Sequence, residues 1–306
     1  MRILITGGLG YIGYTLIEQL TGLSIPEVEI VIYDNLSRNE FSLLNAHHLN
    51  GAHIRFIKGD LLDNHKLQKE VQKADVVIHL AAMVTTPFED KFFHHFDQVN
   101  HWGTANLVSA VEDSDVKHFI YLSSISVFGT NEEMVDENTL VNPDSSYGIS
   151  KYLAEKHVQR LINKIPTHII RSGNVYGYNP AIRLDAVINR FMYEAQFEGL
   201  VRINGDGSQY RGFISVVGLS KIITSLVQNP NYNSGTHLAV TKSLSINDVL
   251  ESLLKIYPDT EFIHSNENMR MKSIKVAVPS SIVKDFNIEN IDLEKELIDF
   301  KQFFIQ

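Results

Sequence analysis

The sequence predicts an α/β protein with a doubly wound parallel sheet and a smaller C-terminal α/β lobe. Two observations predict this fold class. Short apolar runs alternate with amphipathic segments of helix length through the first half of the chain, as in parallel sheets covered by helices on both faces. The first apolar run, residues 2–6, leads directly into a glycine-rich stretch and then into an amphipathic segment, residues 14–20. A strand, a tight turn and a helix in this order begin an α/β unit.

The glycine-rich stretch is the first candidate binding element. Gly7, Gly10 and Gly13 lack a Cβ, so the backbone can turn sharply and approach a pyrophosphate, whose charge the N–H groups of the next helix would face. A second strand, residues 28–33, ends at Asp34, where a carboxylate can bind a ribose diol about twenty residues beyond the turn. The alternative is a glycine-rich turn and a solvated aspartate, but the strand–turn–helix context favours a dinucleotide-binding Rossmann unit.

The remaining elements follow in order along the chain. Residues 74–81 are a nearly continuous apolar run, as expected of a strand buried on both faces, and Asp63 is placed to cap the helix before it. Beyond Gly173 the alternation loosens, and the tail has the pattern of the smaller lobe. We expect further strands at 53–58, 118–124, 167–171, 210–217 and 235–240, and helices at 64–73, 88–112, 145–161, 218–227, 246–256 and 293–304.

Composition limits the class of protein. The 306 residues suffice for two domains: we place a dinucleotide-binding domain at residues 1–172 and 213–241, and a substrate lobe at residues 173–212 and 242–306. A net charge of −9 argues against a nucleic-acid partner, and the absence of cysteine excludes disulfides, thiolate nucleophiles and cysteine-based zinc sites. No leader precedes the first strand and no apolar run is long enough to span a bilayer, so we expect a cytoplasmic protein without a membrane partner.

A tyrosine and a lysine one helical turn apart are the second candidate element. Tyr147 and Lys151 stand at positions i and i+4 of an expected helix and therefore share one face. A nearby cation favours the phenolate form of Tyr147, which could accept a hydroxyl proton while hydride leaves the same carbon. Ser124 ends the preceding strand, at the edge where sites in open α/β sheets gather, and could hold the substrate oxygen. Taken alone, Tyr147 and Lys151 could equally be a surface helix pair.

Further motifs extend these two elements over nearly the whole chain. In order they are Gly7-x-x-Gly10-x-x-Gly13, Asp34-Asn35-Leu36-Ser37, Gly59-Asp60-Leu61, His79-Leu80-Ala81-Ala82, Asn100, Ser123-Ser124-Ile125-Ser126-Val127-Phe128-Gly129, Tyr147-x-x-x-Lys151 and Arg171-Ser172-Gly173-Asn174-Val175-Tyr176-Gly177. With these motifs the chain resembles the extended short-chain dehydrogenases/reductases, and among them the NAD-dependent epimerase/dehydratase family, which acts on nucleotide sugars.

The resemblance implies NAD as the cofactor. Asp34 would bind the adenosine ribose and favour NAD over NADP, because a carboxylate repels a 2′-phosphate, although Arg38, close in the sequence, could offset this preference. Asn100 would be a structural or proton-relay support, and Lys151 would bind the nicotinamide ribose. The implied cofactor-binding residues are Gly7, Gly10, Tyr11, Ile12, Gly13, Asp34, Asn35, Asp60, Leu61, Leu80, Ala81, Ala82, Asn100, Tyr147 and Lys151.

The resemblance also implies a nucleotide-diphosphate sugar as the substrate. Arginine suits its diphosphate because the forked guanidinium donors match phosphate oxygens. The implied catalytic triad is Ser124, Tyr147 and Lys151. The implied substrate-binding residues are Ser124, Asn174, Arg211 and Arg270.

Three positions depart from the family pattern. Dehydratases of the family carry an acid pair directly after the catalytic hydroxyl position, where this chain has Ile125 and Ser126. Since an isoleucine cannot protonate a leaving hydroxyl, dehydration is disfavoured. Val84 replaces a basic residue that some 4-epimerases place near the cofactor phosphates, and Val216-Val217-Gly218 stands where many relatives have Val-Asp-Asp.

The leading hypothesis is therefore an NAD-dependent nucleotide-sugar 4-epimerase, with Tyr147 as the acid/base. The alternative is a nucleotide-4-keto-sugar reductase with the same triad; a dehydratase or a non-catalytic NAD-binding sensor ranks below both. Helices 88–112 and 145–161 resemble the pair that forms a four-helix dimer interface in the family, so we expect a homodimer. We expect no metal site, because the spacing typical of metal ligands is missing from His47, His48, His94, His95 and His101.

Overall fold

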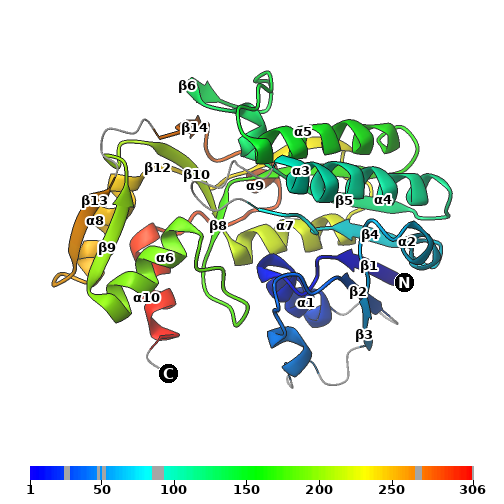
Figure 1. Ribbon diagram of the computed structural model, residues 1–306, viewed down its shortest axis with the longest axis horizontal. Coiled ribbons are helices and arrows are strands. Elements are labelled where there is room, and N and C mark those ends of the chain that lie inside the picture. The colour runs from blue at the N-terminus through cyan, green and yellow to red at the C-terminus, as the bar shows by residue number, and fades with distance from the viewer. Residues whose placement is uncertain (24–27, 47–48, 50–52, 85–92, 266–270, 305–306) are drawn as a thin grey trace.

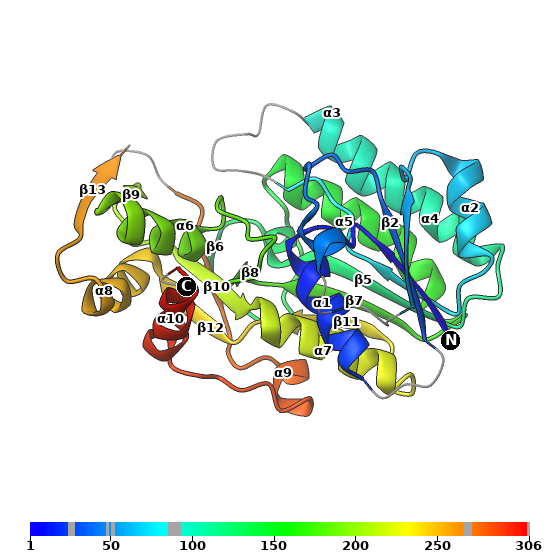
Figure 2. The ribbon, with the colours of Figure 1, turned by 90° about the horizontal axis from the view of Figure 1, so that it is seen from below.

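The computed structural model describes residues 1–23, 28–46, 49, 53–84, 93–265 and 271–304. The chain forms a large sheet flanked by helices, with smaller sheets and helices beside it (Figure 1). The N-terminal strand belongs to the large sheet, and the C-terminal helix lies in the lobe at the other end of the molecule (Figure 2). Within these described ranges, no helix has both the length and the apolar character needed to cross a bilayer.

The large sheet has seven parallel strands in the order β11-β7-β5-β4-β1-β2-β3. The order reverses between β1 and β4, the place where doubly wound sheets bind ligands at the carboxyl ends of their strands. This topology confirms the predicted fold class. The strands are β1 (Arg2–Thr6), β2 (Glu29–Asp34), β3 (His53–Lys58), β4 (Val76–His79), β5 (His118–Ser124), β7 (Thr167–Ser172) and β11 (Gly235–Ala239).

Helices cover both faces of this sheet. α1 and α7 pack on one face, and α2, α4 and α5 pack on the other (Figure 1). Their bounds are α1 (Tyr11–Gly22), α2 (Asn64–Val71), α4 (Gly103–Glu112), α5 (Ser146–Val158) and α7 (Val216–Gln228).

Strand β1 shows why the sheet strands read as continuous apolar runs. Ile3 and Ile5 belong to the core on the α1 and α7 side, whereas Leu4 belongs to the core on the opposite side. All three side chains are fully buried. Successive side chains of a strand point to opposite faces, so a strand covered on both faces needs an apolar residue at every position.

Polar N-caps determine where two helices begin. Asp63 accepts a hydrogen bond from the Lys66 N–H at 3.2 Å and begins α2, as predicted. Ser215 accepts one from the Gly218 N–H at 3.2 Å, so α7 begins at Val216. The strand predicted at 210–217 consequently ends two residues early, at Ser215.

The lobe consists of small sheets and short helices (Figure 2). Its three-stranded sheet has the order β12-β10-β8, and two further pairs are β13-β9 and β14-β6. The strands are β6 (Asn131–Val135), β8 (Asn174–Tyr176), β9 (Leu200–Asn204), β10 (Tyr210–Ser215), β12 (Lys242–Ser245), β13 (Glu261–Ser265) and β14 (Ile274–Val276), and the helices are α6 (Val187–Tyr193), α8 (Ile246–Ile256) and α10 (Leu293–Gln302). The short helix α9 (Ser281–Asp285) instead packs on the core of the large sheet through Ile282 and Val283.

The helix predicted at 88–112 is divided in the structure. Residues 88–92 lie outside the described ranges, and the helical stretch from residue 93 consists of α3 (Phe93–Phe96), the π-helix η4 (Asp97–Trp102) and α4. The predicted domain boundaries stay a prediction. Residues 213–241 contribute to both parts, because the end of β10 lies in the small sheet whereas α7 and β11 lie with the large one.

Candidate active site

A cavity of about 1280 Å³ opens at the carboxyl ends of the central strands. Its wall combines the glycine-rich turn after β1, the ends of β4 and β5, the start of α5 and residues of the lobe. The volume exceeds the roughly 300–1,000 Å³ of a pocket for one small ligand. It therefore has room for a dinucleotide and a second ligand.

The glycine-rich turn is packed so closely that side chains would not fit. Gly7 has φ +70°, and a Cβ there would lie 2.6 Å from the Cα of Ala81. A Cβ on Gly13 would overlap the carbonyl oxygen of Gly8. The Gly10 N–H donates to the Gly7 carbonyl at 3.1 Å, and α1 begins at the next residue. The first N–H groups of α1 thus remain available to an anion in the cavity.

Asp34 stands at the end of β2 with its carboxylate fixed. It accepts hydrogen bonds from the N–H groups of Leu9 at 3.2 Å and Leu36 at 2.9 Å. Asn35 donates to the Asp60 carboxylate at 2.9 Å, which joins the ends of β2 and β3. Both carboxylates and the residues bonded to them belong to the cavity wall, which includes Leu9, Asp34, Asn35, Leu36 and Asp60.

Asn100 supports the cavity wall from behind. Its Oδ1 accepts from the Met83 N–H at 2.7 Å, and its Nδ2 donates to the Met83 carbonyl at 2.9 Å and the Ser150 hydroxyl at 3.0 Å. The side chain is buried and lies outside the set of cavity-lining residues, whereas Leu80, Ala81 and Ala82 line the cavity. Asn100 therefore lies behind the wall, and its expected role as a structural or proton-relay support of the cofactor site stays a prediction.

Ser124 and Tyr147 lie together at the centre of the site. The Ser124 hydroxyl donates to the Ser126 hydroxyl at 3.1 Å and accepts from the Ser126 N–H at 3.2 Å. Burial raises the pKa of Tyr147, while Arg183, a hydrogen bond with Ser124 and Arg38 lower this pKa. The Tyr147 helix begins at a Ser145 N-cap, whose hydroxyl accepts from the Gly148 N–H at 3.1 Å.

Lys151 lies deeper than expected. Its Nζ donates to the Leu122 carbonyl at 2.6 Å and lies 4.3 Å from the ring centroid of Tyr121. Burial lowers the pKa of Lys151 to about 7. The sequence pattern predicted that this ammonium would favour the phenolate of Tyr147, but the cations that lower the pKa of the phenol are Arg183 and Arg38.

The predicted substrate residues lie at the lobe side of the cavity. Asn174 donates to the Gly212 carbonyl at 3.1 Å, and the Arg211 guanidinium donates to the carbonyls of Tyr210, at 3.1 Å, and Lys272. Burial lowers the pKa of Arg211 to about 10. The third predicted residue, Arg270, lies outside the described residues. Asn174 and Arg211 both line the cavity.

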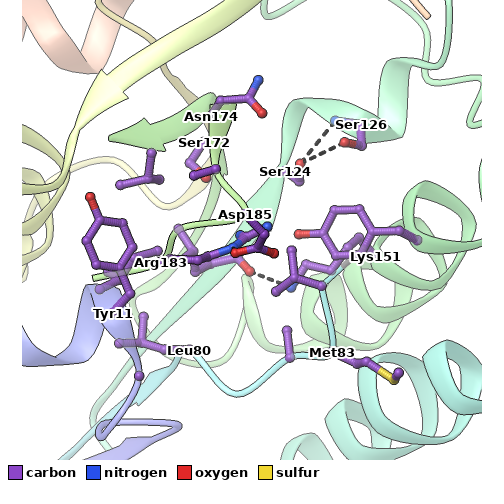
Figure 3. Close-up of a pocket in the computed structure, with 18 of the residues that line it drawn as sticks. Tyr11, Leu80, Met83, Ser124, Ser126, Lys151, Ser172, Asn174, Arg183 and Asp185 are labelled. Carbon is purple, nitrogen blue, oxygen red and sulfur yellow. Dashed lines mark hydrogen bonds and ion pairs between the residues drawn. The ribbon is translucent and has the colours of Figure 1, made fainter. Parts of the chain in front are cut away.

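Several polar residues of the wall belong to no motif of the sequence. Arg183 and Asp185 come from the loop between β8 and α6, and Figure 3 shows them between Tyr11 on one side and Lys151 on the other. No glycine spacing or periodic pattern marks this loop. The only available signal was a pair of opposite charges shortly after a motif. The unassigned polar wall residues include Arg183, Asp185, Arg190, Asn204, Gln209 and Lys272.

The departures from the family pattern have definite surroundings. Ile125 is buried, and the Ser126 hydroxyl is hydrogen-bonded to Ser124. Neither side chain carries a carboxyl group. Val84 lines the cavity. At the third departure, the Val217 carbonyl accepts a hydrogen bond from Gln19 of α1 at 3.1 Å, which ties α7 to α1.

Of the histidines considered as ligands, His47 and His48 lie outside the described residues. His101 is engaged on both ring nitrogens, with Asp97 at 2.8 Å and His157 at 3.1 Å. Among residues that the structure describes, no group of three or more histidine, aspartate or glutamate side chains could hold a metal ion.

Residues 3–240 match the model of the NAD dependent epimerase/dehydratase family. The chain belongs to this family. The relatives of this chain include both dehydratases and epimerases. The human dTDP-D-glucose 4,6-dehydratase is 31% identical over 277 residues, which cover 87% of this chain and 77% of that protein. A putative UDP-glucose 4-epimerase of Methanocaldococcus jannaschii is 29% identical over 256 residues, which cover 81% of this chain and 80% of that one.

Solved structures of epimerases are similar over the whole chain. The UDP-glucuronic acid 4-epimerase from Bacillus cereus, in complex with UDP-glucuronic acid and NAD, is 26% identical with a TM-score of 0.86, and covers 100% of this chain and 99% of its own. The UDP-N-acetylglucosamine 4-epimerase from Methanobrevibacter ruminantium is 26% identical with a TM-score of 0.85, and covers 99% and 98%. This epimerase/dehydratase is thus an NAD-dependent enzyme of the extended short-chain dehydrogenase/reductase type.

The geometry fits the family's cofactor. The turn at Gly7 and Gly13 excludes side chains where a pyrophosphate approaches the backbone, and Asp34 presents a fixed carboxylate at the adjacent strand end. The charges acting on Arg38 are those of Arg183, Asp185 and Tyr147. Arg38 lines the same cavity, and its expected effect on the preference for NAD over NADP stays a prediction.

Proposed function

We propose that this enzyme is a nucleotide-sugar 4-epimerase. The observation that carries the proposal is one arrangement: the glycine-rich turn, Ser124, Tyr147 and Lys151 line a single cavity. A proton-transferring phenol beside a dinucleotide turn is suited to reversible oxidation of a hydroxyl-bearing carbon. The lobe side of the same cavity supplies polar and cationic groups for a diphosphate.

The chain's own residues would hold the sugar and move its proton. Tyr147 would remove the proton of the 4-hydroxyl and later return it, and Ser124 would hold the reacting oxygen. When bound, NAD supplies the hydride acceptor and donor. Lys151 would hydrogen-bond the nicotinamide ribose, because an ammonium has three donors and only one is used by the Leu122 carbonyl.

Asn174 and Arg211 would bind the diphosphate of the substrate. Arg211 is buried enough for its interaction with an anion to be screened only weakly. Its five N–H donors exceed those that its two backbone acceptors use. Asp34 supports NAD over NADP, because a fixed carboxylate would repel a 2′-phosphate.

Epimerisation is preferred over dehydration because of the residues after Ser124. The relatives include a dehydratase, but Ile125 and Ser126 provide no acid that could protonate a leaving hydroxyl group. A 4-keto-sugar reductase would use the same triad and is distinguished by its net use of a nicotinamide cofactor.

The test is incubation of the protein with UDP-, dTDP-, GDP- and CDP-sugars, with sugar products and nicotinamide absorbance followed together. We expect conversion of one sugar into its 4-epimer without net reduction or oxidation of the nicotinamide. Tyr147→Phe should remove this conversion while the protein stays folded. Stoichiometric consumption of reduced nicotinamide would instead identify a reductase, and a 4-keto-6-deoxy product a dehydratase.

We also propose a homodimer formed through α3, η4 and α5. Phe93 and Trp102 expose 40% and 52% of their surface on the first two of these helices. Exposed large aromatic residues on neighbouring helical turns are typical of subunit contacts. Light scattering of the purified protein tests this state directly.

A further inference from the structure

One tyrosine joins the glycine-rich turn to the opposite side of the cavity. Tyr11 is the first residue of α1, directly after Gly10, and lines the cavity. Its main chain therefore lies among the first N–H groups of the helix, which would face a bound pyrophosphate. Its side chain is buried, and the hydroxyl donates to the Gly177 carbonyl at 2.6 Å. The same residue thus takes part in the cofactor turn and in a bond to a distant segment.

The acceptor of this bond is held in place by a sharp turn after β8. Gly177 has φ +119°, a backbone conformation that favours glycine, and a Cβ there would lie 3.3 Å from a methyl group of Val216. The Gly177 N–H donates to the side-chain oxygen of fully buried Asn189, in α6, at 2.9 Å. Both backbone polar groups of Gly177 are therefore bound, one by α1 and the other by α6.

A buried asparagine adds a second link to α1. The amide of Asn179 donates to the Tyr11 carbonyl at 2.8 Å and to the Thr15 hydroxyl at 2.9 Å, and its oxygen accepts from the Ala181 N–H at 2.9 Å. Breaking such bonds is costly, because a buried polar group that loses its partner does not regain one from water. The start of the loop between β8 and α6, residues 177–186, is therefore fixed to the first turn of α1.

The rest of this loop belongs to the lobe and to the cavity wall. Tyr178 stacks on Phe303, at the end of α10, with ring centroids 4.6 Å apart. Asn189 donates to the Arg183 carbonyl at 3.1 Å. The side chains of Arg183 and Asp185 line the cavity, between Tyr11 and Lys151 in Figure 3. A change at the start of α1 can therefore reach the part of the wall that would face a second ligand.

We propose that Tyr11, with Asn179, couples the binding of NAD to the binding of the nucleotide sugar. NAD at the glycine-rich turn fixes the start of α1, and the two side chains transmit this order to the β8–α6 loop. Tyr11 is then a positioning residue that acts on the substrate through the loop. The part of the proposal that concerns the sugar rests on the function proposed above.

The physical basis is the cost of ordering the loop. If the first ligand has already ordered a segment, the second ligand binds without paying that cost and binds more tightly. The coupling is reciprocal, so the nucleotide sugar must increase the affinity for the cofactor by the same factor. Tyr11→Phe keeps the ring and the main chain of the turn but removes the donor to Gly177, and so it should reduce this factor.

The first test follows hydrogen–deuterium exchange of the amides of residues 177–186 in cofactor-free and NADH-loaded protein. NADH should slow this exchange by about fivefold or more in the wild type. Tyr11→Phe and, as a second variant, Asn179→Ala should each lose most of this protection. Tyr257→Phe is the matched control, because it removes a buried hydroxyl that donates to Gln196 at 2.9 Å in the lobe, outside the residues lining the cavity. It should keep the protection.

The second test is calorimetric titration with UDP-glucose and with dTDP-glucose, in cofactor-free and NADH-loaded protein. NADH cannot accept a hydride, so the sugar is bound without being oxidised. We expect NADH to tighten binding of one of these probes by about fivefold or more in the wild type and in Tyr257→Phe. In Tyr11→Phe the factor should fall toward one. A loss of general stability would not produce this result, because the factor compares two states of the same variant.

The outcomes separate this proposal from the function on which it rests. Equal protection of residues 177–186 by NADH in the wild type and in Tyr11→Phe would overturn the coupling, whether or not the enzyme epimerises a sugar. A weaker NADH affinity in Tyr11→Phe with an unchanged factor would also overturn it and make Tyr11 a cofactor contact only. Loss of the protection in Tyr11→Phe, with no 4-epimer found in the sugar panel, would support the link and contradict only the proposed function.

Discussion

The Glu155 carboxylate accepts two hydrogen bonds from the Arg171 guanidinium, at 3.0 and 2.7 Å, across the interface between α5 and β7. Glu155 is fully buried, and the Ser123 hydroxyl donates to the same carboxylate at 2.6 Å. Glu155 follows Lys151 by one helical turn. The buried pair therefore fixes the helix that carries both Tyr147 and Lys151 against the sheet.

Breaking this pair should destabilise the fold strongly. Glu155→Gln leaves the Arg171 charge buried without a counter-charge, and we expect a loss of about 3–5 kcal/mol in the free energy of unfolding. Urea unfolding measures it. Lys117→Met removes a surface pair with Asp75 (3.4 Å) and should cost less than about 1 kcal/mol. Equal losses in the two variants would contradict this prediction, whereas replacing Glu155 and Arg171 together by methionine should recover much of the stability.

Substitutions in the glycine-rich turn should distinguish an effect on stability from an effect on cofactor binding. Gly7→Ala forces a side chain onto φ +70° and against Ala81, and should cost about 1–3 kcal/mol of stability as well as NAD affinity. A Cβ on Gly10 would lie 3.3 Å from the Gly7 carbonyl oxygen, so Gly10→Ala should cost less stability than Gly7→Ala and should act mainly on NAD affinity. Thermal unfolding and calorimetric NAD titration distinguish the two. Gly22→Ala meets open space and is the control; wild-type NAD affinity in Gly7→Ala would be inconsistent with the assigned turn.

Acid should unfold the protein partly through two buried histidines. His118 and His168 pack with their ring centroids 5.2 Å apart, and burial lowers the pKa of His118 to about 4 and of His168 to about 3. Their unfolded pKa is about 6.5, so below that pH the unfolded state binds more protons. Stability is therefore lost as the pH falls from about 6.5 toward 4. His168→Leu should flatten this dependence in urea unfolding at several pH values. Exposed His65→Leu should not, and an unchanged slope in His168→Leu would refute the assignment.

The proposed dimer face can be tested at Trp102. Trp102→Lys places a charge at the exposed centre of this surface and should convert the dimer to monomers, as measured by light scattering. Phe262→Lys changes a similarly exposed aromatic residue on β13, in the lobe, and should leave the dimer intact. Dimers in both variants would point to a different interface.

Sequence patterns predicted the helices and strands whose formation depends on residues close in the sequence. Residues 118–124 and 246–256 form β5 and α8 with the predicted bounds, because a buried apolar run and a Ser245 capping box are local signals. The placement of Lys151 was not predictable in this way, since its ammonium is bound by a carbonyl of another element. Arg183 and Asp185 were missed for the same reason: they line the cavity from the loop between β8 and α6, whose place beside the site no sequence spacing reveals.

The edge position of β11 has a consequence for biosynthesis. This strand completes the sheet beside β7, yet it lies several dozen residues later in the chain, after the whole of α7. A nascent polypeptide leaving the ribosome therefore carries β7 with one unpaired, apolar border until residue 239 has emerged. During that interval, intermolecular strand addition competes with completion of the fold, and truncation products that stop before β11 would be the species most prone to aggregate.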